Sequence, residues 1–561
     1  MKQKITLGRT KDNKKKIKKI LIIIIAIILI GTIAYNISNN IIVDKNKSIN
    51  LVINNKNVTS NLKKEILIEE DNIYISKQDL GNFFDKYIYE DTENNNIVTT
   101  YNNKIASISL EKNKININGS TKNTYAHAEN KEGTIYVPIT ELEDVYGIEI
   151  KYLPDSKVLT IDSTSKEQKK GIITKNVSVK SSTKFISKTI DKVKKGSYVI
   201  VVSEDKGYTK IRTENGKVGY VKTNKVANTV VVREEMQETK QIEGKVNMVW
   251  DYYSEVASAP DRTGVTMDGV NVVSPAFFHL NTSGELTENV GTQGQAYIDW
   301  AHSNGYKVWP MVQNAGNGML NVTSNIMNDY NKRQKLINQI VNYCVKYKLD
   351  GINIDFENVK KANGDDFIQF VRELGIMCRN NGIVLSIDNY PPASYSAYYS
   401  RNEQAAVADY VITMAYDEFY SGSKEAGPVS SISYVRNASE NILKEVPANQ
   451  SIIGLPFYSR LWKETTKNGE TKLSSEACSM KYAEEMISDA KAELKWNEQT
   501  GLEYAEYTKD NALYKIWLEN SKSLAMKLKT VNSHKMAGAA FWKAGMEKKN
   551  VWDTIEKYMA Q

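Results

Sequence analysis

The feature that most constrains the fold is a regular alternation of short apolar segments and helical segments between Gly244 and Gln561. Alternating strands and helices imply a parallel sheet, and a closed barrel of eight such units typically needs about 250 residues. Eight candidate strands occur in order: KVNMVWDYY, VNVVSPAFFHL, KVWPMVQN, LDGINIDFE, GIVLSID, YVITMAYDE, SIIGLPFYS and MAGAAFWKAG. We therefore expect an α/β domain at 244–561, a (β/α)₈ barrel whose chemistry lies where strands end and loops begin.

The fourth candidate strand carries a row of polar side chains on one face. Side chains alternate along a strand, so Asn353, Asp355 and Glu357 face one side and the apolar residues between them face the other. In a barrel the polar row points inward, and Glu357 comes last, at the open end. Two partly buried acids that point the same way repel each other, which pushes one towards the protonated form that a general acid needs. Glu357 is the predicted proton donor.

This segment resembles the signature of glycoside hydrolase family 18, Asp-Gly-x-x-x-Asp-x-Glu within a longer Asp-x-x-Asp-x-Asp-x-Glu pattern. Asp350, Gly351, Asp355 and Glu357 match it, whereas Asn353 replaces the second Asp. An asparagine still supplies hydrogen bonds but no charge. The replacement is therefore expected to weaken the like-charge coupling to Asp355.

The resemblance implies a substrate-assisted mechanism, for which this family is a known exception to the two-carboxylate scheme. Glu357 would protonate the leaving oxygen while the acetamido oxygen of the substrate attacks the anomeric carbon. Asp355 would hold the acetamido N–H, and Tyr416, in VITMAYDEF, would hydrogen-bond the acetamido oxygen. Water activated by Glu357 would then complete the reaction with net retention, so the substrate must carry a 2-acetamido group.

Further substrate contacts are expected along the same mouth. Trp542 would form the floor under the sugar, because an aromatic face suits the apolar face of a pyranose; packing in the barrel interior is the alternative for both Trp542 and Tyr416. The other predicted substrate-binding residues are Asp350, Asn353, Met414, Asp417, Tyr458 and Arg460. Weaker candidates are Trp462, Trp250, Asn389 and Tyr390, together with Tyr504 or Tyr507 in a segment inserted between Trp462 and Tyr514.

Within the family, four segments most resemble the bacterial spore-cortex and cell-wall branch: LDGINIDFEN, GLPFYSRLW, KIWLENSKSLAMKLK and GAAFWKAG. The serine- and glycine-rich third-strand signature of typical chitinases is missing. The branch implies cleavage of N-acetylglucosamine linkages in peptidoglycan. A chitinase or chito-oligosaccharide hydrolase, a non-catalytic sugar-binding family member and a structural stalk protein remain the alternatives.

Two smaller modules are expected before the barrel, so the chain is multidomain. Residues 49–163 resemble the small α+β stalk domain of copper amine oxidase amino-terminal regions, without implying copper chemistry. Residues 172–228, after a lysine-rich linker at 165–171, resemble a bacterial SH3-like β-barrel. Sixteen Lys or Arg against five acids at 166–225 suit an anionic polymer such as peptidoglycan with teichoic acids; a solvated spacer is the alternative.

The amino terminus predicts a membrane anchor. Residues 1–19 hold nine of the basic residues and one acid, and 20–37 are mostly apolar. The positive-inside rule keeps such a tail in the cytoplasm, which favours an uncleaved signal-anchor, rather than a cleaved signal, with the catalytic domain on the cell-wall side.

Composition excludes several classes of function. The tail alone accounts for the net charge of +8. Nucleic acid is therefore not an expected partner, because such binders usually carry their basic patch on the folded part. The three cysteines (Cys344, Cys378, Cys478) form no disulfide framework, and the four histidines have no metal-ligand spacing. No metal or cofactor is expected, and the oligomeric state is left open.

Overall fold

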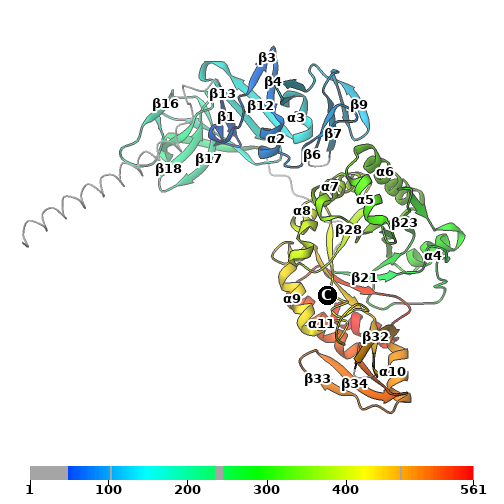
Figure 1. Cartoon of the computed structure of the whole chain (residues 1–561). Helices are drawn as coiled ribbons and strands as arrows, with labels where there is room; N and C mark the ends of the chain where they lie inside the picture. Colours follow the sequence, from blue (N-terminus) through cyan, green and yellow to red (C-terminus); the bar gives the residue numbers. More distant parts are fainter. Residues whose placement is uncertain (1–48, 102–103, 234–243, 468–469, 560–561) are drawn as a thin grey trace, which may run out of the picture. The chain divides into compact units, whose positions relative to one another are not determined.

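The computed structural model describes residues 49–101, 104–233, 244–467 and 470–559, and the chain divides near residue 238 into two compact units (Figure 1). The predicted basic tail at 1–19 and membrane segment at 20–37 lie outside the described residues. Within the described ranges, none of the helices is long and apolar enough to cross a membrane.

The second unit is a closed barrel of eight parallel strands. Each strand pairs with the next, and the last returns to pair with the first (Figure 1). The eight in chain order are β21 (Val246–Asp251), β22 with β23 (Val272–Pro275, Phe278–Leu280), β25 with β26 (Lys307–Val308, Met311–Gln313), β27 (Gly351–Asp355), β28 (Val384–Asn389), β29 (Tyr410–Met414), β30 (Ser451–Pro456) and β36 (Gly538–Trp542). The predicted barrel is confirmed.

The second and third strands are interrupted where the sequence predicted continuous segments. Pro275 ends β22, and Pro310 separates β25 from β26. A proline has no N–H to donate to a neighbouring strand, so the ladder breaks at each point. A short strand, β24 (Leu286–Glu288), pairs antiparallel with β23 outside the barrel.

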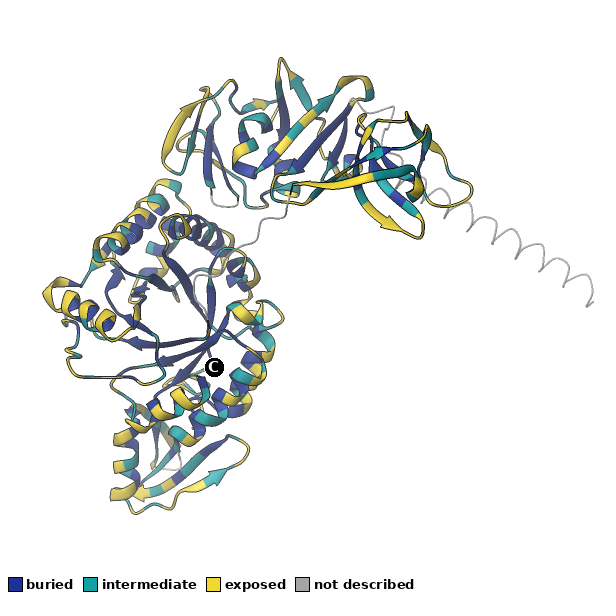
Figure 2. Ribbon diagram, turned by 180° about the vertical axis from the view of Figure 1, so that it is seen from behind, coloured by how far each residue is buried: buried dark blue, intermediate teal, exposed yellow. Residues whose placement is uncertain are grey.

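Helices surround the barrel, and Figure 2 shows buried strands inside a ring of helices whose outer faces are exposed. The outward side of β27 illustrates the packing, because Ile352 and Ile354 in the strand and Phe356 directly after it are buried in the core shared with the helices. The helices are α4 (Gly291–Ser303), α5 (Met319–Met327), α6 (Tyr330–Tyr347), α7 (Gly364–Asn380), α8 (Arg401–Ala405), α9 (Ile432–Ile442), α11 (Ser521–Ser533) and α12 (Asn550–Met559).

Large aromatic side chains fill the barrel interior, and small residues make room for them. A Cβ at Gly351 would lie 2.5 Å from the ring of Trp309, and a Cβ at Gly454 would lie 3.2 Å from both Trp250 and Tyr416. Glycine at these two positions therefore lets the aromatic rings approach the strands.

A small domain is inserted after β30. It is an antiparallel sheet in the order β32-β31-β35-β34-β33, with α10 (Met480–Asp489) packed on one face through Leu461, Ala505 and Ile516. Its strands are β31 (Tyr458–Lys467), β32 (Glu470–Ser479), β33 (Lys495–Asn497), β34 (Leu502–Lys509) and β35 (Ala512–Leu518). The predicted insertion is therefore larger than expected and begins at Tyr458.

The amino-terminal unit begins with three small sheets and two short helices around one hydrophobic core. The first sheet contains β1 (Asn50–Ile53), β2 (Lys56–Asn57), β12 (Ile148–Leu153) and β13 (Val158–Ser163). The second contains β3 (Leu67–Glu69), β4 (Asn72–Ser76), β10 (Glu129–Lys131) and β11 (Thr134–Pro138). The third contains β5 (Tyr89–Asp91), β6 (Asn96–Tyr101), β7 (Lys104–Ser109), β8 (Lys114–Ile117) and β9 (Ser120–Asn123), and the helices are α2 (Lys77–Phe83) and α3 (Glu143–Tyr146).

Seven antiparallel strands follow in the order β16-β15-β19-β18-β17-β14-β20. They are β14 (Gln168–Ile173), β15 (Val177–Lys180), β16 (Thr189–Val193), β17 (Tyr198–Asp205), β18 (Tyr208–Arg212), β19 (Val218–Lys222) and β20 (Val226–Arg233). The predicted linker at 165–171 is wrong in its second half, because β14 pairs with both β17 and β20. The lysines of that segment suggested a solvated connection, but Gly171 and Ile173 are buried on one face of a strand. The SH3-like assignment stays a prediction.

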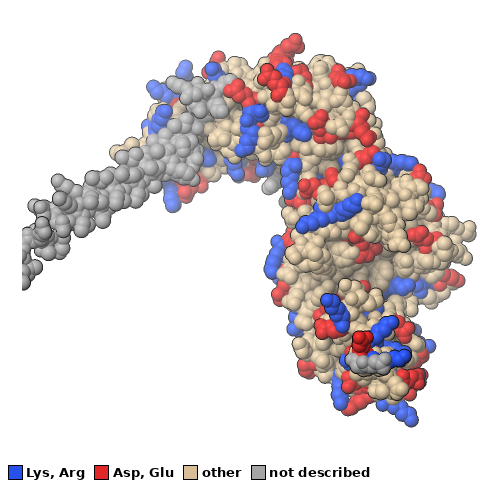
Figure 3. Space-filling model, in the orientation of Figure 1, with Lys and Arg blue, Asp and Glu red and all other residues tan. Residues whose placement is uncertain are grey.

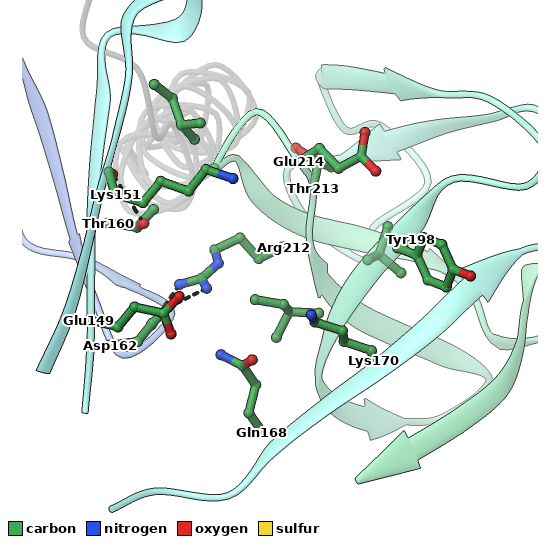
Figure 4. A pocket seen from close by; sticks show the side chains of 14 residues that line it. Glu149, Lys151, Thr160, Asp162, Gln168, Lys170, Tyr198, Arg212, Thr213 and Glu214 are labelled. Carbon is green, nitrogen blue, oxygen red and sulfur yellow. Dashed lines mark hydrogen bonds and ion pairs between the residues drawn. The ribbon is translucent and has the colours of Figure 1, made fainter. Parts of the chain in front are cut away.

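A buried ion pair joins β13 to β18 where the two parts of this unit meet. The Arg212 guanidinium donates to the Asp162 carboxylate at 2.7 Å, and a cavity of about 260 Å³ opens beside the pair (Figure 4). Lys151, Lys170 and Tyr198 also line this cavity. Its buried charges already neutralise each other, so the cavity does not resemble the predicted acid site.

Candidate active site

Glu357 stands at the carboxyl end of β27, two residues beyond the last residue of the strand. The Tyr399 hydroxyl fixes the local backbone by donating to the carbonyl oxygens of Phe356 and Glu357, at 2.9 and 3.1 Å. Part of the Glu357 side chain reaches solvent. Even so, the surrounding protein raises the pKa of its carboxyl by burial, with Asp417 adding repulsion and a hydrogen bond from Tyr390 opposing the rise. A carboxyl shifted in this direction stays protonated to higher pH, as a proton donor requires.

Asp355 lies deeper in the barrel, beside a second acid on the next strand. Asn353 pairs with Ser386 and Ile354 with Ile387, so this register brings Asp388 level with Asp355. Burial raises the pKa of Asp355 well above its ordinary value, and repulsion from Asp388 and then Glu357 raises it further. Burial likewise raises the pKa of Asp388 to about 8.

Asn353 is a buried residue that connects β27 to two other strands through hydrogen bonds, and it is not a substrate contact. Its side-chain oxygen accepts from Trp250 Nε1 at 2.9 Å. Its amide nitrogen donates to Ser386 Oγ at 3.1 Å and to Asp388 Oδ1 at 2.9 Å. The prediction that Asn353 binds substrate is therefore corrected, because this fully buried side chain is engaged on both ends by protein.

An aromatic floor lies next to the acids. Tyr416 stacks on Trp542 with ring centroids 6.4 Å apart and meets Trp250 edge-on at 6.3 Å. Burial and the charges of Asp388, Asp355 and Glu357 raise the pKa of Tyr416 well above its ordinary value, so its hydroxyl remains a donor. Met414 lies below, 8% exposed, at the end of β29. The predicted grouping of Tyr416 and Trp542 with the acids agrees with this placement.

Asp417, Tyr458 and Arg460 form a polar cluster at the mouth. The Tyr458 hydroxyl donates to Asp417 Oδ1 at 2.6 Å, and Arg460 Nη2 lies 3.7 Å from the same oxygen. Arg460 Nη1 donates to Ser475 Oγ at 3.3 Å, which ties the cluster to the inserted sheet. The cluster joins the loop after β29 to β31, and Asp417 approaches closely enough to raise the pKa of Glu357.

Asp350 does not lie with these residues. It precedes β27 at the opposite, amino end, where its carboxylate accepts from Lys307 Nζ at 2.8 Å and contacts His302 Nε2 at 2.9 Å. It also accepts from the Val308 N–H at 3.0 Å. The predicted substrate contact is corrected, because β27 separates Asp350 from the mouth and its carboxylate holds the strand instead.

Only some of the weaker candidates lie close to the acids. Tyr390 reaches Glu357, whereas Asn389 points away from the interior and bonds Gln404 of α8 at 2.7 Å. Trp462 is buried and donates to the Gly427 carbonyl at 2.8 Å, so it packs the insertion against the barrel. Tyr507 stacks on Tyr514, on the sheet face that α10 covers.

Asp388 is the functional candidate that sequence reasoning missed. The segment VLSIDN ends in two polar residues, and only the second was considered. Alternation alone does not single out Asp388, because Ser386 and Asp388 are seen to face the same side as Asn353 and Asp355 only once the register between the two strands is known.

Basic and acidic side chains are interspersed on the face of the barrel unit that Figure 3 shows. That face offers no broad basic area of the kind expected for a nucleic-acid partner.

Comparison with known proteins places these features in a family. The chain is 24% identical over 303 residues to a Bacillus subtilis protein named "Uncharacterized glycosylase YvbX", covering 51% of this chain and 84% of that protein. It is 26% identical over 234 residues to the Bacillus subtilis "Cortical fragment-lytic enzyme", covering 40% of this chain and 54% of that protein. The crystal structure of the Bacillus megaterium spore cortex-lytic enzyme shares the fold with a TM-score of 0.51 and 20% identity, over 60% of this chain and 77% of the other.

Two family models match the chain. The copper amine oxidase N-terminal domain matches residues 33–161, which confirms the predicted resemblance of the stalk. The glycosyl hydrolases family 18 model matches residues 248–547, more than half of the chain and all eight barrel strands except the first two residues of β21. The protein therefore belongs to glycosyl hydrolase family 18, and the prediction of a glycosidase is confirmed.

Proposed function

We propose that this chain cleaves N-acetylglucosamine linkages in cell-wall peptidoglycan by a retaining, substrate-assisted mechanism. The observation that carries the proposal is a pair of acids at two depths in the barrel. Glu357, with a raised pKa, stands at the barrel mouth, and the partly buried Asp355 lies beneath it. The Tyr416–Trp542 floor adjoins both acids. An acid above a partly buried carboxylate and an aromatic surface suits a sugar whose own acetamido group acts as the nucleophile.

In the first step Glu357 donates its proton to the glycosidic oxygen as the bond from that oxygen to the anomeric carbon breaks. The acetamido oxygen of the same sugar forms a new bond to that carbon. Asp355 accepts from the acetamido N–H, and the Tyr416 hydroxyl donates to the acetamido oxygen before it attacks. In the second step the Glu357 carboxylate takes a proton from water, whose oxygen replaces the acetamido oxygen, so the original configuration returns.

Product analysis tests the bond that is cut. Purified peptidoglycan digested by the wild-type chain should release fragments with reducing-end N-acetylglucosamine, identified by mass spectrometry. Reducing-end muramic acid would contradict the assignment. The variant Glu357→Gln should lose about 10²–10⁴-fold in kcat, the usual contribution of a positioned acid. Unchanged activity in this variant would end the enzyme proposal.

The substrate class is supported by the printed names of relatives that act on spore cortex, and by segments that resemble that branch. Chitin digested in parallel separates the alternatives. Faster release from chitin than from peptidoglycan would favour a chito-oligosaccharide hydrolase. Binding of either polymer without turnover would favour a non-catalytic family member.

We also propose that the chain is a single-pass membrane protein whose barrel lies on the cell-wall side. The support is the basic tail at 1–19 and the apolar run at 20–37. The barrel should fractionate with membranes and be digested by protease added to cells whose wall has been removed. Recovery in the medium without the first 37 residues would instead indicate cleavage.

A further inference from the structure

We propose that Asp388 is a positioning residue that shares one proton with Asp355, so that these two inward carboxyls together hold a single negative charge beneath the bound sugar. The inference rests on the proposed function, because it assigns the charge to the acetamido group of the substrate. Asp388 is not part of the family 18 signature, because it belongs to β28, the next strand of the barrel.

Strand register places the two carboxyls side by side. Neighbouring strands lie about 4.8 Å apart, and the pairing of Asn353 with Ser386 and of Ile354 with Ile387 leads to Asp355 opposite Asp388. Both side chains point to the inside of the barrel, on the same face as Asn353. Two carboxyls at this spacing, in a buried site, cannot both ionise easily.

Asn353 holds Asp388 in that position. Its amide donates to Asp388 Oδ1 at 2.9 Å, while Trp250 Nε1 fixes the other end of the same amide at 2.9 Å. The orientation of Asp388 is thus set by two strands other than its own. The asparagine that replaces the second acid of the signature positions an acid that arrives from β28.

The surrounding groups offer no compensating positive charge. Asp388 faces Asn353 and Asp355 from β27, Glu357 from the following loop, Trp250 from β21 and Tyr416 from beyond β29. Among the described residues, no cation contributes to the pKa shift of any of the three carboxyls. A shared proton is the remaining way to lower the repulsion, and the raised pKa values of both aspartates agree with it.

One acceptor is left for the substrate. Asp355 Oδ1 is buried and has no hydrogen-bond partner among the described residues. Such an atom usually signals a missing partner. A proton held by Asp388 would supply it, because an oxygen buried this completely is closed to the sugar. The partly exposed Asp355 carboxylate would then keep the charge for the acetamido N–H.

Three variants separate this role from packing. Asp388→Asn keeps a hydrogen-bonding amide and leaves one charge on Asp355, but it cannot ionise. Asp388→Ala removes the partner and should lower kcat about tenfold or more, the cost of an unsatisfied buried group, and should lower it more than Asp388→Asn. The exchange Asn353→Asp with Asp388→Asn returns a second acid to the interior from the neighbouring position on β27.

The pH dependence of kcat/KM is the decisive kinetic readout. The alkaline limb of the wild-type profile should report loss of protons from both Glu357 and the aspartate pair. Asp388→Asn should report one proton fewer, read from the slope of the limb, and the exchange variant should restore it. An unchanged slope in Asp388→Asn, or failure of a folded exchange variant to restore it, would overturn the proposal.

An infrared titration provides a readout that needs no turnover. In a Glu357→Gln background, a protonated-carboxyl band should disappear on alkaline titration, at lower pH than with Glu357 present, because the Glu357 charge helps to raise the pKa of Asp388. Adding Asp388→Asn should remove the band, while the control Asp350→Asn should leave it, because Asp350 is already ionised beside Lys307. Persistence of the band after Asp388→Asn would overturn the shared proton. Absence of wild-type turnover on every N-acetylglucosamine substrate would instead count against the proposed function.

Discussion

At the scale of single residues, the acidity of Glu357 is set by three opposing influences. Burial and the charge of Asp417 raise its pKa, and the hydrogen bond from Tyr390 lowers it. The hydrogen bond favours the charged form, so it limits how far the carboxyl can be pushed towards neutrality. Tyr390 therefore adjusts the pH at which the donor stops working.

Removing that hydrogen bond should move the alkaline limit upwards. In Tyr390→Phe the pKa of Glu357 should rise further, so the acid form persists and kcat/KM should fall only at higher pH than in the wild type. A pH series of kcat/KM measures the shift. Tyr395→Phe is the matched control, since Tyr395 contacts Tyr390 but does not influence Glu357. A downward shift in Tyr390→Phe would contradict this account.

The residues on the signature strand were predictable because alternation along one strand is a local property. Asp388 was not, because its relevance depends on the register between β27 and β28, and register is a tertiary property that no single segment encodes. The role of Asn353 also depends on tertiary structure. Its residue type predicted hydrogen bonds, but only the closed barrel shows that other strands provide its partners.

At the scale of elements, the two ends of β27 perform different tasks. The carboxyl end presents the acids, whereas the amino end is held by Asp350. Burial alone would raise the pKa of Asp350, but Lys307, the Val308 amide and His302 together lower it. A lowered pKa means that these contacts stabilise the fold above the unfolded-state pKa and that the benefit is lost as pH falls through the folded-state value.

Asp350→Asn should therefore reduce stability without changing the chemistry. We expect a loss of about 1–3 kcal/mol at neutral pH, as for a hydrogen-bonded charge, and a smaller loss in acid. Urea denaturation of the barrel unit at both pH values measures the difference. A large fall in kcat at unchanged stability would instead return Asp350 to the substrate site.

The interior of the barrel makes a second element-scale prediction. Gly351→Ala places a methyl group 2.5 Å from the buried Trp309 ring, and overpacking of this kind costs about 1–3 kcal/mol. Trp309→Phe in the same chain should recover part of the loss. Thermal unfolding of the single and double variants tests this, and additive losses would show that the two residues do not compete for space.

The order and location of all eight barrel strands could be predicted, because apolar segments that alternate with helical ones leave few topologies. The interruptions at Pro275 and Pro310 could not be predicted, since a proline breaks a ladder only where its nitrogen faces a neighbouring strand. The insertion that begins at Tyr458 was underestimated because its strands carry many charged residues.

At the scale of the whole molecule, a buried ion pair joins the two parts of the amino-terminal unit, with its members on either side of the predicted lysine-rich linker. Arg212 and Asp162 are 6% and 11% exposed in their side chains. Removing one member leaves an uncompensated buried charge, which typically costs about 3–5 kcal/mol.

Arg212→Ala should therefore lower the unfolding temperature of the amino-terminal unit while the barrel unit retains its turnover. Differential scanning calorimetry of the full chain, together with an activity assay, measures both effects. Lys169→Ala removes an ion pair whose side chains are 42% and 49% exposed, and it should change neither transition measurably. Equal effects of the two variants would show that burial does not distinguish these pairs.

The linker was mispredicted because composition and pairing gave conflicting signals. Lysines at 169 and 170 favoured solvent, but partners on β17 and β20 decide the conformation, and those partners lie more than 25 residues away. The extent of the barrel was predictable from length and pattern, whereas the junction within the amino-terminal unit depended on contacts distant in sequence.

The glycine at 454 has a consequence for how this barrel can diversify. Because a Cβ at that position would lie 3.2 Å from both Trp250 and Tyr416, a larger residue at 454 requires one of these rings to shift. Homologues that carry a bulkier residue at 454 should also carry a smaller residue in place of Trp250 or Tyr416. Changes of substrate preference over evolutionary time should then accumulate in the connecting loops, where replacements are independent of one another.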